Sequence, residues 1–413
     1  MPAFLTHWHV LIETARRSQD AGNDLGSLII DAAALRRRSH GLDTPPQTTP
    51  AGAVWDTGPL PEIDYSFPGS DISAMAYLGA LAPDMTYYAP SNFREKMTDR
   101  RLQRSSIQLP ANNNALWADL LHNKRSGDVL LTFLEFIADV PSPALRSQAL
   151  AFAMGYLSHI ATDIALNPYI NALAAAYDRG EVPGMGVFNR LGVHFFVELC
   201  LDEYIASVYF HRSLYVWTNQ PWWQYIEPAA QSITTGAMLS ARVLDLLATA
   251  AEAIYGLSEE QAKTFHLDHL AGLQGLRRYL AGRGSYRFLI WRLLSRPRAG
   301  NPVTATITAG HDGEGSFHEV LAYAIRLSER FCRGAMSYYA ALRNVNAGAN
   351  ERSGKRAILR DDLRNWRLDS GYAADVTLDQ DVTLHLLHNW AHFAELWEPD
   401  TEAADQPQAS LNH

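Results

Sequence analysis

The sequence predicts an all-α protein, a multi-helix bundle that carries extra helices in its C-terminal half. Apolar residues recur at helical spacing through most of the 413 residues, and only two short segments suggest strands. The hydrophobic content of 47% and the charged content of 19% are typical of a globular protein with a large core. The sequence shows no internal repeat.

Helical periodicity places most elements directly. The first stripe, over residues 4–21, includes Phe4, Trp8, Leu11 and Ala15. The helix over 144–166 should stop at Asn167-Pro168, because the residue before a proline avoids helical backbone angles. In order along the chain, helices are expected over residues 4–21, 24–38, 115–123, 128–138, 144–166, 190–211, 228–256, 257–298, 316–343 and 383–397.

The segments between these helices differ in composition. Residues 72–83 are an apolar run that ends at Pro83-Asp84. Residues 39–71 are rich in Pro and Gly and predict a long loop, and residues 344–382 are polar with a short strand expected near Val376–Leu378. We expect a helical domain over 1–227, a helical extension packed on it over 228–398, and a disordered tail over 399–413.

Charge and cysteine content limit the classes of function. The net charge of −9, from 35 basic and 44 acidic residues, argues against a broad nucleic-acid surface. The two cysteines cannot form a disulfide framework. The N-terminus lacks the features of a signal peptide, and no apolar run approaches the length of a transmembrane helix. The expected location is therefore cytoplasmic.

One stretch, GYLSHIATDIALNPYIN over residues 155–171, carries the clearest chemical pattern. His159 and Asp163 are four residues apart, which places both side chains on one face of a helix. Imidazole and carboxylate suit zinc. The surrounding residues are apolar, and a buried carboxylate is costly unless it is paired or binds a metal. The alternative reading is a core histidine that is hydrogen-bonded to an aspartate.

A second histidine and acid pair, His194 and Glu198, repeats the four-residue spacing, and Asp202 follows one turn later. Asp84 is a candidate ligand, a helix cap or a turn residue. His7 and His122 also fall on or beside apolar helical stripes. The candidate ligands are therefore His7, Asp84, His122, His159, Asp163, His194 and Glu198. They are numerous enough for a multinuclear zinc site.

With these residues in place, the chain resembles the bacterial zinc-dependent phospholipase C family, which is related to the fungal zinc single-strand nucleases. The resemblance covers about residues 1–215 and rests on THWHVLIETA, LGALAPD, LWADLLHNKRSGD, GYLSHIATDIALNPYIN and the pair at 194 and 198. It implies a phospholipase C- or nuclease-like helical bundle with a trinuclear zinc site.

The resemblance also implies how the ligands are shared. One zinc would be held by Asp84, His122, His159 and Asp163. A second would use His7, or His9 in its place, with Asp163 as the bridge to the first. A third would use His194 and Glu198.

The family has a further histidine before the proline that follows its His-Asp helix, and this chain has Asn167 there. Asparagine is a poorer zinc ligand than imidazole. Two zinc ions are therefore expected. The third site is weaker, empty, occupied by another metal, or completed by Asp202.

The implied activity is phosphodiester hydrolysis of phospholipase C type, in which a zinc-bridged hydroxide attacks phosphorus. Asp84 would be both a ligand and the general base. The substrate would be a phosphoester, with phospholipid as one candidate. Two alternatives remain. One is a single-strand nuclease or phosphomonoesterase with the same metal site, and the other is a helical scaffold that binds metal without catalysis.

Overall fold

The computed structural model describes residues 4–20, 71–88, 116–178, 238–259, 317–368 and 372–373, with scattered positions between 197 and 209 and between 261 and 275. Its elements are α1 (Phe4–Asp20), α4 (Asp71–Gly79), the short 3-10 helix η1 (Met85–Tyr88), α6 (Leu116–Asn123), α7 (Ser126–Asp139), α8 (Pro143–Asp178), α12 (Met238–Tyr255), α16 (Phe317–Arg343), α17 (Ala349–Leu363), β1 (Trp366–Arg367) and β2 (Tyr372–Ala373). This part of the chain is overwhelmingly helical, which confirms the predicted all-α class.

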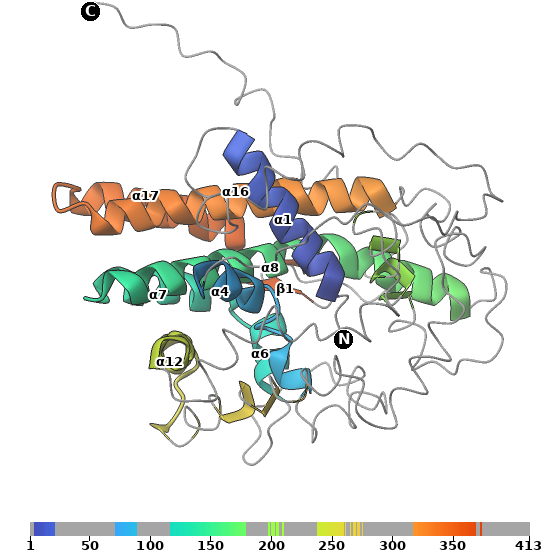
Figure 1. Ribbon diagram of the computed structural model, residues 1–413, viewed down its shortest axis with the longest axis horizontal. Helices are drawn as coiled ribbons and strands as arrows, with labels where there is room; N and C mark the ends of the chain where they lie inside the picture. Colours follow the sequence, from blue (N-terminus) through green and yellow to red (C-terminus); the bar gives the residue numbers. More distant parts are fainter. Residues whose placement is uncertain are drawn as a thin grey trace, which may run out of the picture.

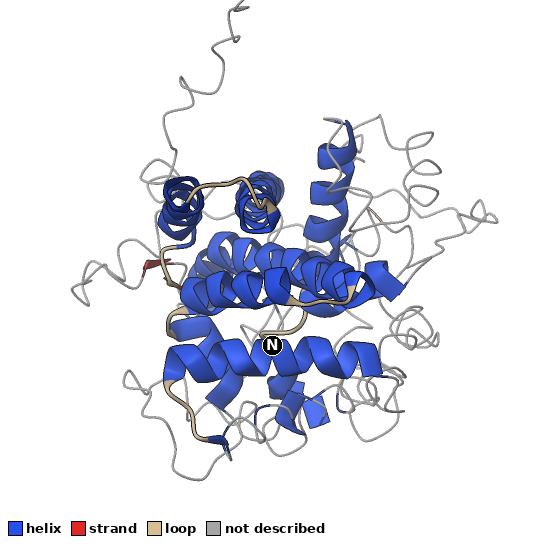
Figure 2. Cartoon of the chain, turned by 90° about the vertical axis from the view of Figure 1, so that its left-hand side faces the viewer, coloured by secondary structure: helices blue, strands red, loops and turns tan. Residues whose placement is uncertain are grey.

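Helix α8 is the centre of the arrangement (Figure 1). It contacts α1, α4, α7, α12, α16 and β1. Helices α16 and α17 lie on one side of the tier formed by α4, α7 and α8, and α12 lies on the other side (Figure 1 and Figure 2). The buried apolar side chains of all these helices form one continuous core. Helices α12 and α16, from the predicted extension, therefore share their core with the helices of the first domain.

Two glycines allow α4 and α8 to approach until their backbones touch. A Cβ on Gly155 would lie 1.9 Å from the carbonyl oxygen of Ala76, and a Cβ on Gly79 would lie 2.0 Å from the carbonyl oxygen of Phe152. Only a residue without a side chain fits such an approach. The contact places the turn that follows α4 directly against the middle of α8.

The predicted end of the long helix at Asn167-Pro168 is wrong, because α8 continues through Pro168 to Asp178. Proline removes one helical hydrogen bond and disfavours a helix interior by about 3 kcal/mol. The residues that follow compensate for this cost, because Tyr169, Ile170 and Leu173 are all buried in the core. Tertiary packing therefore overrides the local signal.

The polar segment 344–382 also differs from its prediction, because it contains helix α17. Few of its side chains are apolar, and only Leu359, Asp362 and Leu363 of this helix are buried. Strands β1 and β2 follow it and pair antiparallel, with Trp366 opposite Ala373. The predicted strand near 376–378, the helices over 24–38 and 383–397 and the tail over 399–413 lie outside the described residues.

Within the described residues, Pro143–Leu173 is long and apolar enough to cross a membrane. Its most apolar window, however, is 100% buried inside the protein. A helix that is covered on all sides by other helices is apolar because it forms the protein core, so its composition alone does not indicate a membrane span.

Candidate metal centre

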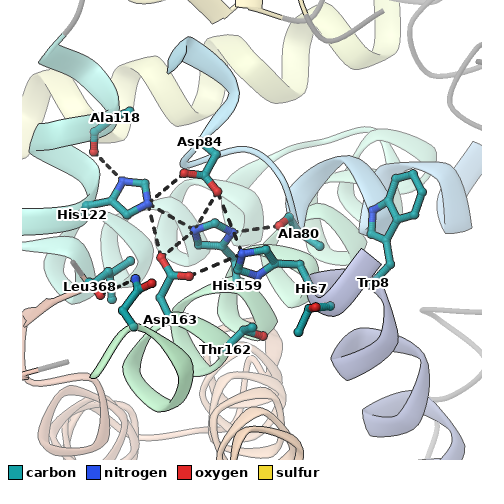
Figure 3. A network of polar contacts seen from close by, with 12 residues as sticks. His7, Trp8, Ala80, Asp84, Ala118, His122, His159, Thr162, Asp163 and Leu368 are labelled. Carbon is teal, nitrogen blue, oxygen red and sulfur yellow. Dashed lines mark hydrogen bonds and ion pairs between the residues drawn. The ribbon is translucent and has the colours of Figure 1, made fainter. Parts of the chain in front are cut away.

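Five of the seven predicted site residues come together around the middle of α8 (Figure 3). His159 and Asp163 lie on α8, His7 on α1 and His122 in the last turn of α6. Asp84 lies in the turn between α4 and η1. All five side chains are buried.

The elements that carry these residues are fixed by contacts outside the cluster. The close approach of α4 to α8 occurs at Gly155, one turn before His159, and Asp84 Oδ2 lies 3.7 Å from His159 Nε2. Helix α1 is attached to α4 by the Trp8 indole, whose Nε1 donates to the carbonyl oxygen of Tyr77 at 3.1 Å. His7 is adjacent to Trp8 and is thereby held against α8.

Backbone carbonyls set the orientation of two of the imidazoles. His122 Nδ1 lies 2.6 Å from the carbonyl oxygen of Ala118, and His159 Nδ1 lies 2.9 Å from that of Ala80. A carbonyl only accepts hydrogen bonds, so each Nδ1 carries the proton and each Nε2 presents a lone pair to the cluster. Metal-binding histidines in proteins are oriented in this way.

The inward-facing atoms are spaced as zinc ligands are. A tetrahedral zinc with nitrogen and oxygen ligands at about 2.0–2.2 Å needs neighbouring ligand atoms about 3.3–3.5 Å apart. His122 Nε2 lies 3.2 Å from Asp84 Oδ1, 3.3 Å from Asp163 Oδ2 and 3.4 Å from His159 Nε2. His159 Nε2 lies 3.2 Å from Asp163 Oδ2 and 3.7 Å from Asp84 Oδ2. Among them, the ligand atoms of Asp84, His122 and His159 form a group that could hold one metal ion, and Asp163 Oδ2 lies beside both imidazoles.

Asp163 divides its two oxygens between different partners. Its Oδ2 faces His122 and His159, whereas its Oδ1 lies 3.4 Å from His7 Nε2. The His7 and His159 rings are stacked, with centroids 4.1 Å apart. A carboxylate with this placement can bridge two metals, and His7, His159 and Asp163 form a second group whose ligand atoms could hold an ion.

Burial and the close packing of charges shift the pKa values of the cluster. Burial alone would raise the pKa of Asp84, but His159 and His122 outweigh it and lower the pKa to about 2. Burial also acts to raise the pKa of Asp163, but the neighbouring imidazoles outweigh it and hold the pKa well below its usual value. Burial, together with the charge of His159, lowers the pKa of His7 to about 4. Both carboxylates are therefore ionised at neutral pH and His7 is neutral, as metal binding requires. For His159, burial acts to lower the pKa, but Asp163 and Asp84 outweigh it and raise the pKa, so a metal would displace a proton there.

Of the ligands predicted for the third zinc, only Glu198 lies among the described residues. Glu198 is buried, and its carboxylate is among the charges that act to raise the pKa of His7. His194 lies outside the described residues. The Asn167 amide nitrogen donates to the carbonyl oxygen of Leu368 at 2.7 Å. His9 is buried with its ring against Tyr209, at a centroid distance of 4.1 Å.

Asp202, one of the alternatives for completing the third zinc site, is engaged at the start of α1. Its Oδ2 accepts from the Leu5 N–H at 3.2 Å, and its Oδ1 accepts from the Thr6 N–H at 3.0 Å and the Thr6 hydroxyl at 2.9 Å. These N–H groups belong to the first turn of α1, where no helical partner exists for them. Asp202 therefore fixes the start of the helix that carries His7.

Replacing Asp202 with Ala should lower the free energy of unfolding by about 2 kcal/mol, because it leaves buried N–H groups of α1 without an acceptor. Chemical denaturation followed by circular dichroism measures the change. Asp202→Asn keeps one acceptor oxygen and should lose less stability than Asp202→Ala. Equal stability of wild type and Asp202→Ala would contradict this role.

Sequence reasoning missed the backbone partners of the site. The carbonyls of Ala80 and Ala118 orient the imidazoles, and the backbone of Leu368 contacts both His122 and Asn167. Backbone atoms are the same in every residue, so no residue type marks them. The Gly155 close approach has a weak signal, which is a glycine inside a helical pattern.

Comparison with known proteins identifies a related family. A family model described as zinc dependent phospholipase C matches residues 57–166, about a quarter of the chain. The match confirms the resemblance read from the sequence, and it contains Asp84, His122, His159 and Asp163. No curated protein and no solved structure matches the chain.

Proposed function

We propose that this chain is a zinc-dependent phosphodiester hydrolase of phospholipase C type, because residues 57–166 match the model of that family and supply four buried ligand candidates. Its substrate would be a phosphoester, with a phospholipid as the first candidate. The proposal includes two zinc ions, one at Asp84, His122, His159 and Asp163, and one at His7 and the second oxygen of Asp163.

One observation supports metal binding most directly. The Nε2 atoms of His122 and His159 face each other at 3.4 Å, while both Nδ1 protons are donated to carbonyls. Two imidazole lone pairs at this distance repel each other unless a cation, either a proton or a metal ion, lies between or beside them. The ionised carboxylates of Asp84 and Asp163 complete the surroundings of that cation.

The residues of the chain then have distinct tasks. When bound, zinc makes water more acidic and neutralises charge on a phosphate. Asp163 would supply one oxygen to each metal position, and the carbonyls of Ala80 and Ala118 keep two imidazoles from rotating. Asp84 is proposed as a ligand and as the acceptor of a proton from the attacking water. Its pKa of about 2 favours the ligand task, because an efficient base has a pKa near the working pH.

The purified protein should contain at least two zinc ions per chain and hydrolyse p-nitrophenyl phosphorylcholine. Metal analysis and a release assay measure these results, with bis-p-nitrophenyl phosphate and single-stranded DNA as competing substrates. His159→Gln should lose zinc and activity, whereas His318→Gln should retain both, because His318 contacts Tyr204 and Tyr209 and not the cluster.

Other outcomes of the same experiment separate the alternatives. Turnover of single-stranded DNA in preference to the choline ester would indicate a nuclease with the same metal site. Two zinc ions without turnover of any substrate would indicate a scaffold. Fewer than two zinc ions per chain would contradict the proposal of a multinuclear zinc hydrolase.

A further inference from the structure

A short C-terminal segment, residues 363–368, lies against the helices that carry the metal ligands. We call it the clasp. The Leu368 N–H donates to the carbonyl oxygen of His122 at 2.7 Å, and the Leu368 carbonyl accepts from the Asn167 amide, also at 2.7 Å. The Ser126 hydroxyl donates to the carbonyl oxygen of Trp366 at 2.9 Å. One residue of the clasp thus joins α6 to α8.

The clasp has a second attachment at the start of α7. Asn365 Oδ1 accepts from the backbone N–H of Asp128 at 2.9 Å, and Asn365 Nδ2 donates to Asp128 Oδ2 at 3.1 Å. A Cβ on Gly127 would lie 2.9 Å from the Cβ of Leu363. The clasp and the start of α7 are therefore as close as their atoms allow.

The backbone at this junction is strained. Among the described residues, the non-glycine residues with positive φ are Arg125 at 51°, Arg364 at 41° and Asn365 at 50°, and all of them lie where the clasp meets α6 and α7. Such angles are unfavourable for residues with a Cβ, and they persist only where surrounding contacts enforce them. Strain of this kind concentrates at sites where position matters.

The clasp contacts His122 in the last turn of α6. The helix ends at Asn123, one residue later, and the His122 carbonyl accepts from the Leu368 N–H. Asn167 lies on α8 one turn beyond Asp163, and two turns beyond His159, on the same helical face. A carbonyl cannot donate, so the Asn167 amide must present its nitrogen to Leu368. The chain of contacts from His122 through Leu368 to Asn167 therefore links the ligand on α6 to the helix that carries the other two.

We propose that the clasp is a positioning element for the metal centre, which holds His122 at the distance from His159 and Asp163 that one metal ion requires. This inference rests on the proposed function. It assigns the C-terminal extension, which lies beyond the matched residues 57–166, a part in metal affinity. Asn167 serves this purpose as a donor to the clasp.

The test is the zinc affinity of Asn167→Leu, which keeps the size of the side chain and removes its donor. Zinc affinity is measured by competition with a chromophoric chelator, at a temperature where circular dichroism shows that the wild type and the variant are both folded. One of the two zinc ions should bind the variant about 10–100-fold more weakly, which is the usual effect of losing a contact that orients a metal ligand. The zinc at His7 should change less. Asn171→Leu, one turn further along α8, is the matched control and should bind zinc as the wild type does.

Two additional variants guard against a purely structural explanation. Asn167→Gln restores the donor and should recover part of the lost affinity. Ser126→Ala removes the separate contact to Trp366 and should weaken the same zinc ion. In the cobalt-loaded protein, the visible absorption of the weakened site should change in Asn167→Leu and not in Asn171→Leu.

The outcomes divide clearly. Selective loss of one metal in Asn167→Leu and Ser126→Ala supports the clasp as a positioning element. Wild-type affinity for both metals in these two variants, or a lower stability with unchanged affinity, overturns it. If the wild-type protein binds no zinc, the proposed function is overturned, and the proposal that the clasp positions a metal ligand is overturned as well.

Discussion

Asp163→Asn should abolish turnover, with a fall in kcat/KM of at least about 1,000-fold, and should reduce bound zinc to at most one ion per chain. The substitution keeps the size of the side chain but replaces one of two anionic oxygens with an amide nitrogen, which cannot bind a cation. Asp163 places one oxygen 3.4 Å from His7 and the other 3.2–3.3 Å from His159 and His122. Loss of either oxygen therefore removes a ligand from one of the two metal positions, and loss of the negative charge weakens both.

Steady-state kinetics on a chromogenic phosphodiester and metal analysis of the same preparation measure this result. The matched control is Asp362→Asn, which makes the same change at a buried aspartate that pairs with Arg330 between α17 and α16. The control should keep its zinc and most of its activity. Full zinc content in Asp163→Asn would show that this carboxylate is a hydrogen-bond acceptor for His159 and no ligand, the alternative that the sequence left open.

Gly155→Ala is expected to lower the free energy of unfolding by about 3 kcal/mol, at the upper end of overpacking effects. The new Cβ would lie 1.9 Å from the carbonyl oxygen of Ala76 and 2.7 Å from the backbone nitrogen of Ala80. Both atoms belong to the backbone, so the clash is relieved only if α4 and α8 move apart. That movement also withdraws the Ala80 carbonyl from His159 and Asp84 from the cluster.

Urea denaturation with and without zinc measures the stability change and its coupling to the metal. Gly354→Ala is the control, because Gly354 lies in helix α17 with nothing within 4 Å of the position of its Cβ. It should gain about 0.5–1 kcal/mol, since alanine restricts the unfolded chain more than glycine does. If Gly155→Ala were as stable as the wild type and bound zinc normally, the close approach would not be what positions Asp84.

The helices could be predicted where one apolar stripe faces the core, as in α1, α7 and α16. Helix α17 was missed because so few of its side chains are buried, and its place is set by contacts with α16 and α7. The end of α8 was misplaced because Pro168 is a strong local signal. The burial of Tyr169 and Leu173, which overrides that signal, depends on helices that come much later in the chain.

The candidate site likewise has one part that could be predicted from local sequence and another that could not. The spacing of His159 and Asp163 on one helix predicts their proximity from geometry alone. Asp84, His122 and His7 join them across long stretches of sequence. Their places on or beside apolar elements made them candidates, but their grouping around one site depended on a family resemblance. The contacts of Leu368 with His122 and Asn167 bridge residues more than 200 positions apart and use backbone atoms. Side-chain patterns carry no record of such contacts.

The central place of α8 also bears on how this protein could be divided. One face of α8 presents His159 and Asp163, and its opposite side is covered by α16, where Phe317 lies beside Tyr169 and the Cys332 thiol reaches the carbonyl of Met154. Cutting the chain after residue 227 would strip that cover and expose an apolar surface along the helix that carries the ligands. Among the described residues, α12 and α16 share one core with the helices that precede residue 227. We therefore expect a protein shortened at that residue to aggregate instead of serving as a minimal enzyme.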